Sequence, residues 1–542
     1  MIPPASGSGS PRPLFARSPL PLPTGSESAA FDREAIENRG VPSPVLMENA
    51  GRSAALVLDS LSPRTPICVL AGPGHNGGDG IVLARTLHLA GRDVRVVVVG
   101  DRQDPDPLLH GHSPALIRID AESLVEDWEA VEVALAECPV LVDALLGTGV
   151  RGAPRPPFGR ILAELGARRT RGARIVALDL PSGVDADTGA APGGLPGADL
   201  TLTFGAPKLG CLLHPGRAMS GRIVALEIGF PPWPEGAAGA ELITPEWAGT
   251  RAPRRALRSH KKGEGRLLLL GGAPGMGGAI IMAARAALRA GAGYVRVASH
   301  PDQVRLLHAT VPEAVVVDAS DTDAFMEALS DSDALAAGPG MGRGTLAASL
   351  ERALESLPSS VRILLDADAL TLLASGDLPR WAERIPDGGS GARLLTPHPG
   401  EASALLGIEA SAIVADPLRH ARECAQRWGA TVLLKGTPSV VAHGRPGRVR
   451  VSLSGSSEFA RAGMGDVLTG VSGALLARGL GAPDAAALAL HWTGRAADHL
   501  AMGPALLPGD VTDALPAAMG ETGPGSTDLS LPFVLLDLPP AH

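Results

Sequence analysis

Apolar and polar residues follow two rhythms along the chain: short continuous apolar runs, and longer stretches whose apolar residues recur at helical spacing. In the first half the short runs are ICVLAG, VRVVVVG, VLVDALLG, RIVALDL, DLTLTFG and RIVALEIG. These runs predict strands, and the stretches between them predict helices. Two more helices are expected ahead of the first strand, over 31–40 and 43–61, with Ser43 as candidate N-cap of the second. Continuous apolar strands between helices predict a parallel sheet covered on both faces.

A second block of the same kind begins at Gly265. Its strand-like runs are RLLLLGG, YVRVAS, AVVVD, ALAAGPG, RILLDADAL, RLLTPHP, TVLLKG, SVVAHG and VRVSLSG. Its helical stretches include AIIMAARAALRAGA, DPLRHARECAQRWG, GDVLTGVSGALLARGL and DAAALALHWTGRAADHLA. The glycine motifs of the two blocks differ, so the blocks are not an internal repeat. The predicted fold class is α/β, with two doubly wound domains.

The chain of 542 residues is too long for one core, and its composition suggests where the domains end. Residues 1–28 are rich in Pro, Ser and Gly and are expected to be a disordered extension. The first domain is expected over 29–240, a linker over 241–257 and the second domain over 258–525. Residues 526–542 are expected to be a C-terminal tail.

Charge and composition exclude several classes of protein. The formal charge is −9 and no long basic run occurs, which argues against a nucleic-acid partner. No segment has the roughly 18 apolar residues of a membrane helix, and the N-terminus does not read as a secretory signal. The four cysteines have neither metal nor disulfide spacing, which fits a reducing, cytoplasmic setting. We expect small-molecule substrates and a homo-oligomer.

The glycine-rich stretch AGPGHNGGDG, residues 71–80, lies between a predicted strand and a predicted helix. Such a loop directs backbone amides at an anion, so it predicts a phosphate cradle. Gly72, Gly74 and Gly77 satisfy G-x-G-x-x-G, and Asp101 follows the next strand, so a dehydrogenase cofactor site is one alternative. A Walker loop is excluded because no G-K-[ST] follows.

Other polar residues follow later strands of the first block. Asp143 lies at the end of one predicted strand, Asp179 and Ser182 come after another, and Asn76 lies in the glycine loop. Each could be only a cap or a turn former. Because the carboxyl ends of parallel strands share one edge, we expect the four to converge on a ligand there.

In the second block the sharpest motif is ARAGMGDVLTG, which opens an apolar helix. Its first-turn amides and helix dipole can bind a phosphoryl group, and Asp466 beside them can take a proton from a hydroxyl. The alternative is an ordinary helix start. Further polar residues at strand ends are Asp366, Asp368, His398, Glu401 and Lys435, with glycines at 338, 340 and 342.

The first block resembles the NAD(P)H-hydrate epimerases in the motifs LMENAG, GPGHNGGDG, VDALLGTG, LDLPSGVDADTG and TFGAPKLG, across residues 31–235. The resemblance implies a Rossmann-like domain in which the dinucleotide is the substrate and Asp179 is catalytic. It implies that Asn76, Asp143 and Ser182 hold potassium, and their hard oxygen donors suit such an ion. The substrate would contact His75, Asn76, Gly77, Gly78, Asp79, Gly147, Thr148, Gly149, Val150, Arg151, Gly152, Ala153 and Asp179.

The second block resembles the ribokinase-like NAD(P)H-hydrate dehydratases in HKKGEGRLLLLGG, GPGMG, DADAL, LTPHPGE, LKGT and GMGDVLTG, across residues 258–520. The resemblance implies that Asp466 is catalytic. The substrate would contact Ala279, Gly340, His398 and Asp466, and the nucleotide Lys435, Gly436, Thr437, Pro438, Ser439 and Gly465. The chain departs from the family at Met464, where a small residue is usual, and GGAPGMGGA lacks an aromatic residue often found there.

Together the two resemblances imply a bifunctional enzyme that repairs hydrated NADH and NADPH. The first domain would interconvert the R and S hydrates at C6, and the second would dehydrate the S hydrate with ADP or ATP and Mg²⁺. ADP is favoured, because the fused arrangement resembles bacterial enzymes that use ADP. One alternative is a vitamin-precursor kinase fused to a sugar- or nucleotide-binding module. The other is a first domain that binds its ligand without catalysis.

Overall fold

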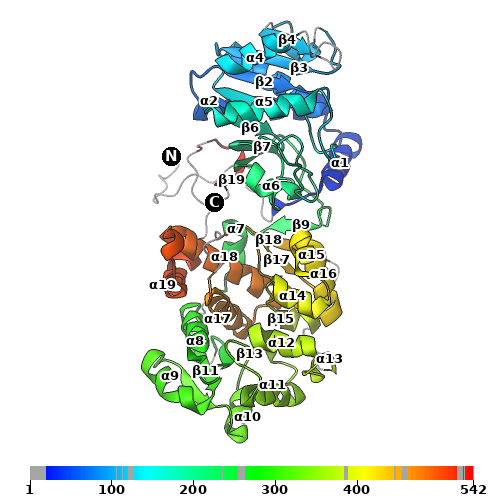
Figure 1. Ribbon diagram of the computed structural model, residues 1–542. Coiled ribbons are helices and arrows are strands. Elements are labelled where there is room, and N and C mark those ends of the chain that lie inside the picture. Colours follow the sequence, from blue (N-terminus) through cyan, green and yellow to red (C-terminus); the bar gives the residue numbers. More distant parts are fainter. Residues whose placement is uncertain are drawn as a thin grey trace, which may run out of the picture. The chain divides into compact units, whose positions relative to one another are not determined.

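The apolar runs of the first half form a sheet whose strands follow the order β19-β8-β7-β6-β5-β2-β3-β4 (Figure 1). The computed structural model describes residues 20–104, 106–112, 114–119, 127–234, 236–253, 263–383, 389–444, 447–454, 461–521, 529 and 531–540. The chain divides into two units, Met1–Ala240 with Pro524–His542, and Glu241–Gly523. The predicted α/β class is confirmed in both units.

In the first unit the sheet is parallel except for β19, which pairs antiparallel with β8. Val69 is in register with Val96 on one side and Val142 on the other. The strands of this sheet are β2 (Ile67–Ala71), β3 (Val94–Val99), β4 (Ala115–Ile119), β5 (Val140–Ala144), β6 (Arg174–Leu178), β7 (Leu200–Phe204), β8 (Arg222–Leu226) and β19 (Val534–Leu538); the short strand β1 (Leu20–Pro21) is not part of it.

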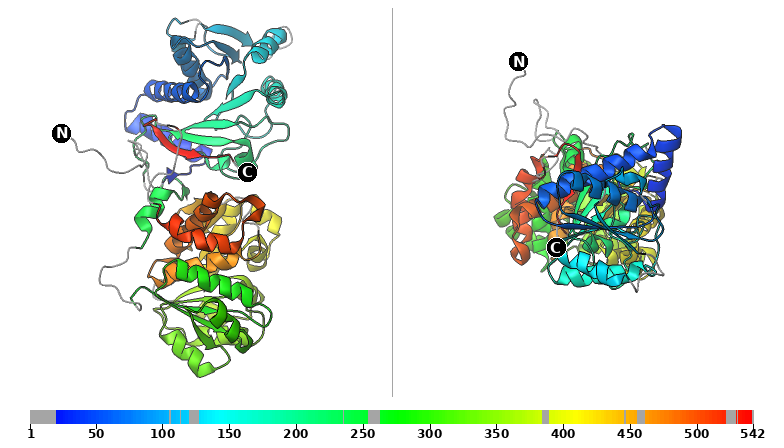
Figure 2. Two further views of the ribbon diagram at one scale, coloured as in Figure 1. Left: turned by 90° about the vertical axis from the view of Figure 1, so that its left-hand side faces the viewer. Right: turned by 90° about the horizontal axis from the view of Figure 1, so that it is seen from above.

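Helices cover both faces of this sheet, because alternate strand residues point to opposite sides (Figure 2). Val69 packs with α2 and α3, whereas Leu70 packs with α4 and α5. The helices are α1 (Gly25–Arg33), η1 (Glu34–Asn38), α2 (Ser43–Leu61), α3 (His75–Leu89), η2 (Pro107–Leu109), α4 (Trp128–Glu137), α5 (Phe158–Thr170), η3 (Leu209–Cys211) and α6 (Gly216–Met219).

The amino-terminal part of the first unit departs from the sequence-based expectation. Leu20 and Leu22 are buried, and α1 begins at Gly25 with a capping box made by Thr24 and Glu27, so residues 20–28 are not a disordered extension. Residues 1–19 of the expected extension lie outside the described residues. The prediction of Ser43 as an N-cap was wrong: Pro42 occupies that position, and Ser43 is the first residue of the helix.

The described part of the expected C-terminal tail is the edge strand β19. Arg222 on β8 pairs with Asp537 (Nη2–Oδ2 2.6 Å), and Arg217 donates to the carbonyl of Pro539. Val534 is buried in the apolar cluster that includes α2 and α3. Strand β19 therefore completes the sheet that the first half of the chain begins.

The second unit is built on a sheet of order β9-β18-β17-β16-β15-β14-β13-β10-β11-β12. The pairs β16–β17 and β17–β18 are antiparallel, whereas the pairs from β15–β16 to β11–β12 are parallel. The strands are β9 (Ala240–Leu242), β10 (Arg266–Leu270), β11 (Tyr294–Ser299), β12 (Val315–Asp318), β13 (Ala334–Ala337), β14 (Arg362–Leu365), β15 (Arg393–Leu395), β16 (Thr431–Leu434), β17 (Ser439–Ala442) and β18 (Val449–Ser452).

Helices α8, α17, α18 and α19 pack on one face of this sheet, and α11, α12, α14 and α16 lie on the other (Figure 1). The helices are α7 (Pro245–Arg251), α8 (Gly277–Arg289), η4 (Pro301–Gln303), α9 (Val304–Thr310), α10 (Thr322–Ser330), α11 (Thr345–Ser356), α12 (Ala367–Ser375), α13 (Arg380–Glu383), η5 (Gly389–Ala392), α14 (Pro399–Leu406), α15 (Ala410–Ala415), α16 (Pro417–Trp428), α17 (Met464–Ala477), α18 (Ala482–Leu500), η7 (Gly503–Ala505) and α19 (Pro508–Met519). Within the described residues, no helix is both long and apolar enough to span a membrane.

The expected linker over 241–257 belongs to the second unit as far as residue 253. Glu241 on β9 pairs with Arg448 and Arg450, and Trp247 on α7 is buried. The apolar and charged partners of these residues are far away in the sequence, which is why composition alone suggested a linker.

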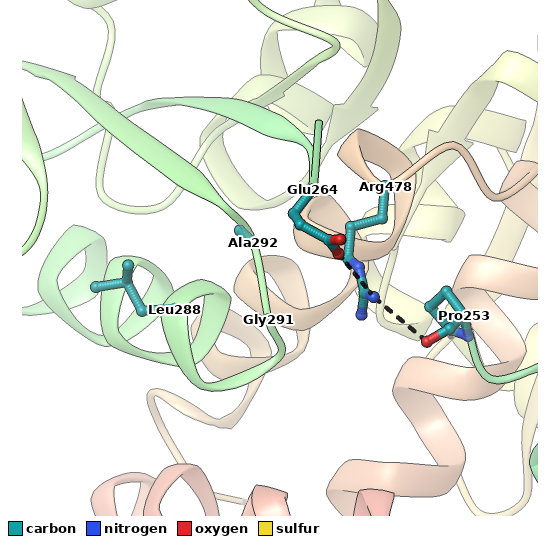
Figure 3. A pocket seen from close by; sticks show the side chains of 6 residues that line it. All are labelled: Pro253, Glu264, Leu288, Gly291, Ala292 and Arg478. Carbon is teal, nitrogen blue, oxygen red and sulfur yellow. Dashed lines mark hydrogen bonds and ion pairs between the residues drawn. The ribbon is translucent and has the colours of Figure 1, made fainter. Parts of the chain in front are cut away.

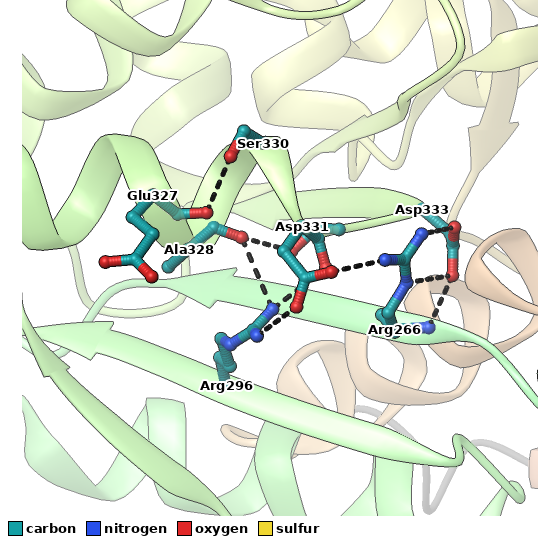
Figure 4. Close-up of polar contacts among 8 residues, drawn as sticks. Arg266, Arg296, Glu327, Ala328, Ser330, Asp331 and Asp333 are labelled. Atoms are coloured by element: carbon teal, nitrogen blue, oxygen red, sulfur yellow. Dashed lines mark hydrogen bonds and ion pairs between the residues drawn. The ribbon is translucent and has the colours of Figure 1, made fainter. Parts of the chain in front are cut away.

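A network of two arginines and two aspartates joins the amino ends of β10, β11 and β13 (Figure 4). Arg266 forms a two-pronged pair with Asp333 (Nε–Oδ2 3.0 Å, Nη2–Oδ1 2.6 Å) and also reaches Asp331, which binds Arg296 as well. Two-pronged pairing fixes geometry as well as charge, so the network holds these strand ends in register.

Candidate active sites

The glycine loop of the first unit connects β2 to α3 and passes very close to the loop after β5. A Cβ atom on Gly72 would lie 1.8 Å from the carbonyl oxygen of Leu145, and one on Gly77 would lie 1.8 Å from that of Gly72. Arg102 braces the loop by donating to the carbonyls of Gly72 and Gly74 at 3.1 and 3.2 Å. Glycine is therefore required here by close backbone packing as well as by any ligand.

Asn76, Asp143 and Ser182 come together as the topology predicts, around the backbone of Leu146. The Ser182 hydroxyl donates to Asp143 Oδ1 (2.6 Å), and the Ser182 amide donates to Asp143 Oδ2 (2.9 Å). Asn76 Nδ2 donates to the Leu146 carbonyl (2.8 Å), whose amide donates to the Ser182 hydroxyl (2.9 Å). Burial raises the pKa of Asp143, while hydrogen bonds from Ser182 and Leu145 act against that rise.

The donor set of this cluster fits a cation held by oxygen atoms. Asn76 Oδ1 is buried and meets no hydrogen-bond donor among the described residues. A buried amide oxygen without a partner is costly, so a cation beside it would satisfy the atom. The Asp143 carboxylate supplies one negative charge, which is less than a calcium site usually has.

Asp179 follows β6 in the left-handed region, with φ +65°. Its Oδ1 accepts hydrogen bonds from the amide of Phe204 (3.2 Å) and the hydroxyl of Thr203 (3.3 Å), and it pairs with the Lys208 ammonium. Lys208 is buried. The loop after β7 thus fixes the carboxylate, although aspartate rarely adopts this backbone conformation.

Asp32 and Asp79 extend this cluster. Burial raises the pKa of both carboxyl groups, Asp79 well above its usual range; the Asp179 charge raises both further, and Lys208 opposes the shift. Asp79 was expected at the substrate site from the glycine loop. Asp32 was missed because it lies on α1, far from any strand end in the sequence. Only the fold shows that it is next to Phe31, which is buried and stacks on Trp233.

Only the beginning of the loop over 147–153 lies against the cluster that contains Asn76. Gly147 packs against Asn76, whose Cβ would lie 3.5 Å from a Cβ on the glycine. Arg151 is exposed and pairs with Asp187 (Nη2–Oδ2 2.5 Å). The remaining residues of this loop, Thr148, Gly149, Val150, Gly152 and Ala153, are at least partly exposed.

In the second unit a buried ion pair lies at the carboxyl edge of the sheet. Lys435, after β16, donates to Asp366 Oδ1 (2.8 Å), and Thr469 on α17 donates to Asp366 Oδ2 (2.7 Å). Burial alone would raise the pKa of Asp366, but the Lys435 charge and these hydrogen bonds outweigh it and lower the pKa. Burial alone would lower the pKa of Lys435, but the charges of Asp366 and Glu401 outweigh it and raise the pKa.

Asp466 lies in the first turn of α17 beside this pair and is half-buried. Burial raises the pKa of its carboxyl group to about 6, with Asp366 and Asp368 adding to the shift and Lys435 opposing it. A carboxyl group with this pKa is largely ionised at neutral pH and can still accept a proton readily. The neighbouring Met464 is buried in the apolar core.

The expected substrate residues form two groups near α17. Gly340 has φ +55°, and a Cβ there would lie 2.8 Å from the Met276 carbonyl and 3.2 Å from the Cβ of Ala279. His398 caps α14, with Nδ1 accepting from the amides of Gly400 (3.0 Å) and Glu401 (3.2 Å). Glu401 Oε2 lies 3.7 Å from Lys435 Nζ, which connects the histidine to the ion pair.

The expected nucleotide loop, residues 435–439, is a tight turn between β16 and β17. The Ser439 hydroxyl donates to the carbonyl of Gly436 (2.9 Å), while Gly436 and Thr437 are exposed and Pro438 is buried. The side chain of Lys435 points away from the turn, towards the carboxylates of Asp366 and Glu401. Gly465 contacts it: a Cβ there would lie 3.5 Å from Lys435 Nζ.

A cavity of about 340 Å³ lies elsewhere in the second unit, at the amino ends of β10 and β11 (Figure 3). It is lined by Pro253, Glu264, Leu288, Gly291, Ala292 and Arg478. Arg478 pairs with Glu264 at 3.4 Å. Because no expected site residue lines it, the carboxyl edge with Asp466 remains the better candidate for catalysis. In the described part of the chain, His, Cys, Asp and Glu side chains form no group of three or more suited to a metal.

Comparison with known proteins gives matches to both halves of the chain. Residues 267–517 match a family model described as NAD(P)H-hydrate dehydratase, and residues 43–210 match one described as YjeF-related protein N-terminus.

Among curated proteins, a bifunctional NAD(P)H-hydrate repair enzyme of Moorella thermoacetica is 35% identical over 525 residues, covering 91% of this chain and 96% of the relative. The enzyme of that name in Salinibacter ruber is 38% identical, covering 88% and 92%. Among solved structures, an ADP/ATP-dependent NAD(P)H-hydrate dehydratase of Bacillus subtilis has a TM-score of 0.44 and 26% identity, covering 51% of this chain and 96% of that one.

Proposed function

The chain belongs to the family of bifunctional NAD(P)H-hydrate repair enzymes, and we propose that each unit works at the carboxyl edge of its own sheet. The first unit epimerises the R and S hydrates of NADH and NADPH at C6. The second unit dehydrates the S hydrate with the help of a nucleotide. An epimerase on the same chain makes both hydrates available to a dehydratase that uses one of them.

In the first unit, Lys208 would donate a proton to the C6 hydroxyl, which leaves as water, and Asp179 would take a proton from the water that returns. That hydroxyl is on the carbon next to the ring nitrogen, so its departure is assisted by the nitrogen lone pair. Water can then return to either face of the planar carbon, which exchanges the two epimers. The paired carboxylate and ammonium offer a proton acceptor and a proton donor within one site. The glycine loop over 72–80 and the loop over 147–153 would hold the dinucleotide.

Potassium is the ion that we propose for Asn76, Asp143 and Ser182. The unpartnered Asn76 Oδ1 and the single carboxylate support a monovalent cation more than a divalent one. A bound cation would neutralise Asp143 and tie together the loops after β2, β5 and β6. Because Asp179 lies on the last of these loops, the ion would keep it in place.

In the second unit, Asp466 would take the proton from the C6 hydroxyl as the terminal phosphoryl group of ADP or ATP is transferred to that oxygen, with AMP or ADP as the leaving group. Phosphorylation converts hydroxide, a poor leaving group, into phosphate. Loss of phosphate together with a proton from C5 restores the ring double bond. The first-turn amides of α17 would bind the phosphoryl group, Lys435–Ser439 and Gly465 the nucleotide, and Ala279, Gly340 and His398 the hydrate. Magnesium bound with ADP or ATP would screen the phosphate charges.

The observation that best supports this assignment is the half-buried Asp466 with a pKa of about 6 at the amino end of α17. The test supplies mixed hydrates with ADP or ATP and follows the absorbance of reduced nicotinamide. Recovery of that absorbance is expected, with a loss of roughly 100-fold or more in Asp466→Asn, the scale of a lost general base. Nucleotide binding should survive in the variant. A stable phosphorylated product would instead indicate the vitamin-precursor kinase.

A further inference from the structure

In the ion pair of Lys435 and Asp366, directed hydrogen bonds fix the orientation of the carboxylate, which neutralising a buried charge would not by itself require. Asp366 is 2% exposed, and its carboxylate oxygens receive directed hydrogen bonds, Oδ1 from Lys435 (2.8 Å) and Oδ2 from Thr469 (2.7 Å), with Thr396 as a further hydrogen-bond partner. The carboxylate is thus fixed from two sides, by the end of β16 and by α17. An ammonium paired with a fixed carboxylate is itself fixed.

The Lys435 ammonium lies close to the backbone of α17, the helix that carries Asp466. A Cβ on Gly465 would lie 3.5 Å from Lys435 Nζ and 3.8 Å from Asp366 Oδ2. Gly465 immediately precedes Asp466. The pair therefore lies beside the first turn of α17, where a transferred phosphoryl group would also lie.

Lys435 has a second carboxylate within reach. Glu401 Oε2 is 3.7 Å from its Nζ, and Glu401 is held by the amide of His398 (2.8 Å). A lysine ammonium on a flexible stem pairs with whichever carboxylate is charged and close. Without the Asp366 charge, the ammonium would turn towards Glu401 and away from Gly465.

We propose that Asp366 is a positioning residue for dehydration, which holds the Lys435 ammonium beside Gly465 so that the cation faces both Asp466 and the phosphoryl group. The inference rests on the proposed role of Asp466 as base. Thr469 in turn orients Asp366. Lys435 would therefore contact the phosphoryl group of the nucleotide that is transferred.

The electrostatic surroundings of Asp466 allow a directional test. The described charged groups that face it are Asp366 after β14, Asp368 in the first turn of α12 and Lys435 after β16. The helices packed on the other side, α8 and α19, present Met282 and Pro508 near Gly463, and these are uncharged. Lys435 lowers the pKa of Asp466, whereas Asp366 raises it.

The experiment is a double-mutant cycle on the full-length protein, with Asp366→Asn, Lys435→Met and the combined variant. Each single variant should lose between about 10- and 100-fold in kcat for dehydration, the scale for a misplaced catalytic group. The combined variant should lose no more than the worse single variant, because both changes disable the same ammonium. Lys435→Met should also move the acid limb of the kcat/KM profile to higher pH, because the charge that lowers the pKa of Asp466 is lost. In the combined variant the limb should lie at lower pH than in Lys435→Met, because the Asp366 charge that raises this pKa is lost as well.

Glu264→Gln is the matched control. It removes the charge of a buried carboxylate that pairs with Arg478 in the same unit, away from the site, and should leave kcat unchanged (Figure 3). If Asp366→Asn does not fold, Thr469→Val decides: a lower kcat with an acid limb moved to higher pH supports the inference, and a wild-type kcat or an unmoved acid limb overturns it. A wild-type kcat in Asp366→Asn, or fully additive losses in the cycle, would also overturn it. Persistent dehydration in Asp466→Asn would instead overturn the proposed base.

Discussion

At the scale of single residues, Asp466, the base that we propose for dehydration, carries a charge that lowers the stability of the folded state. Burial, then the charge of Asp366, raises its pKa to about 6. The native state therefore binds a proton on Asp466 more tightly than the unfolded chain does. The stability that this proton contributes is fully present below the unfolded pKa of about 4 and is lost as the pH rises through 6.

Asp466→Asn should therefore raise the stability of the second unit at neutral pH while it abolishes dehydration. The gain should be present above pH 6, where the wild type carries the buried charge, and absent below about pH 4. Thermal unfolding of both proteins across this pH range measures the effect. A variant that is less stable than the wild type at neutral pH, or a gain that grows on acidification, would contradict it.

Two glycines of the same loop should respond very differently to alanine. A Cβ on Gly72 would lie 1.8 Å from a backbone oxygen that cannot move independently, whereas one on Gly74 would meet nothing within 4 Å. Gly72→Ala should destabilise the first unit by roughly 3 kcal/mol or more, because it overpacks backbone against backbone. Gly74→Ala should stay within about 0.5 kcal/mol of the wild type. Denaturant unfolding tests both, and equal stabilities would refute the packing argument.

At the scale of elements, the sequence predicted the buried strands well and the edges poorly. The apolar runs of β2, β3 and β5 are buried on both faces, so a continuous run is a reliable signal. Strand β4, Ala115–Ile119, was missed because it is an edge strand with partly exposed residues and an internal arginine. Helix α1 was placed too late, although the capping box Thr24–Glu27 was present in the sequence.

The candidate sites were predictable to the extent that topology brings strand ends together. Asp143 lies at the end of β5, and Asn76 and Ser182 come shortly after β2 and β6, so one sheet edge unites the three. Thr469 and Asp32 could not be found in the same way, because each lies on a helix far from any strand end in the sequence. Helix packing decides which helical side chain reaches the sheet edge, and the periodicity of apolar residues does not predict helix packing in this detail.

Strand β19 permits a prediction about a whole element. It covers β8 and buries Val534, so a chain that ends at Leu529 should destabilise the first unit by about 2 kcal/mol or more, the cost of exposing a buried aliphatic residue. The second unit should be unaffected. A chain that ends at Pro540 keeps the strand and is the matched control. Calorimetry that resolves the two unfolding transitions would show whether only the first one falls.

At the scale of the whole molecule, the chain leaves its first unit, builds the second, and returns to finish the first. A simple division at the expected linker therefore leaves each half incomplete. A fragment over 1–245 lacks β19, and a fragment over 246–542 lacks β9 while it carries an unpartnered edge strand. Separate activities are better examined in the intact chain by a substitution that affects one site only.

Asp143→Ala is such a substitution. The residue is 2% exposed and receives both hydrogen bonds of Ser182, so its loss should release the loops after β5 and β6 and remove the charge that balances the proposed ion. Asp179 lies on the second of these loops, so epimerisation should fall by roughly 100-fold or more, the scale for a misplaced catalytic group.

Dehydration of the S hydrate by the same variant should stay near wild type, because Asp466, Asp366 and Lys435 belong to the other unit. The measurement follows both activities in one preparation, with potassium present or replaced by a bulky organic cation. The wild type should lose epimerisation when potassium is replaced, and Asp143→Ala should not respond to the exchange because its site no longer holds the ion. Equal loss of both activities, or full epimerisation in Asp143→Ala, would show that the first unit has no separate ion-supported site.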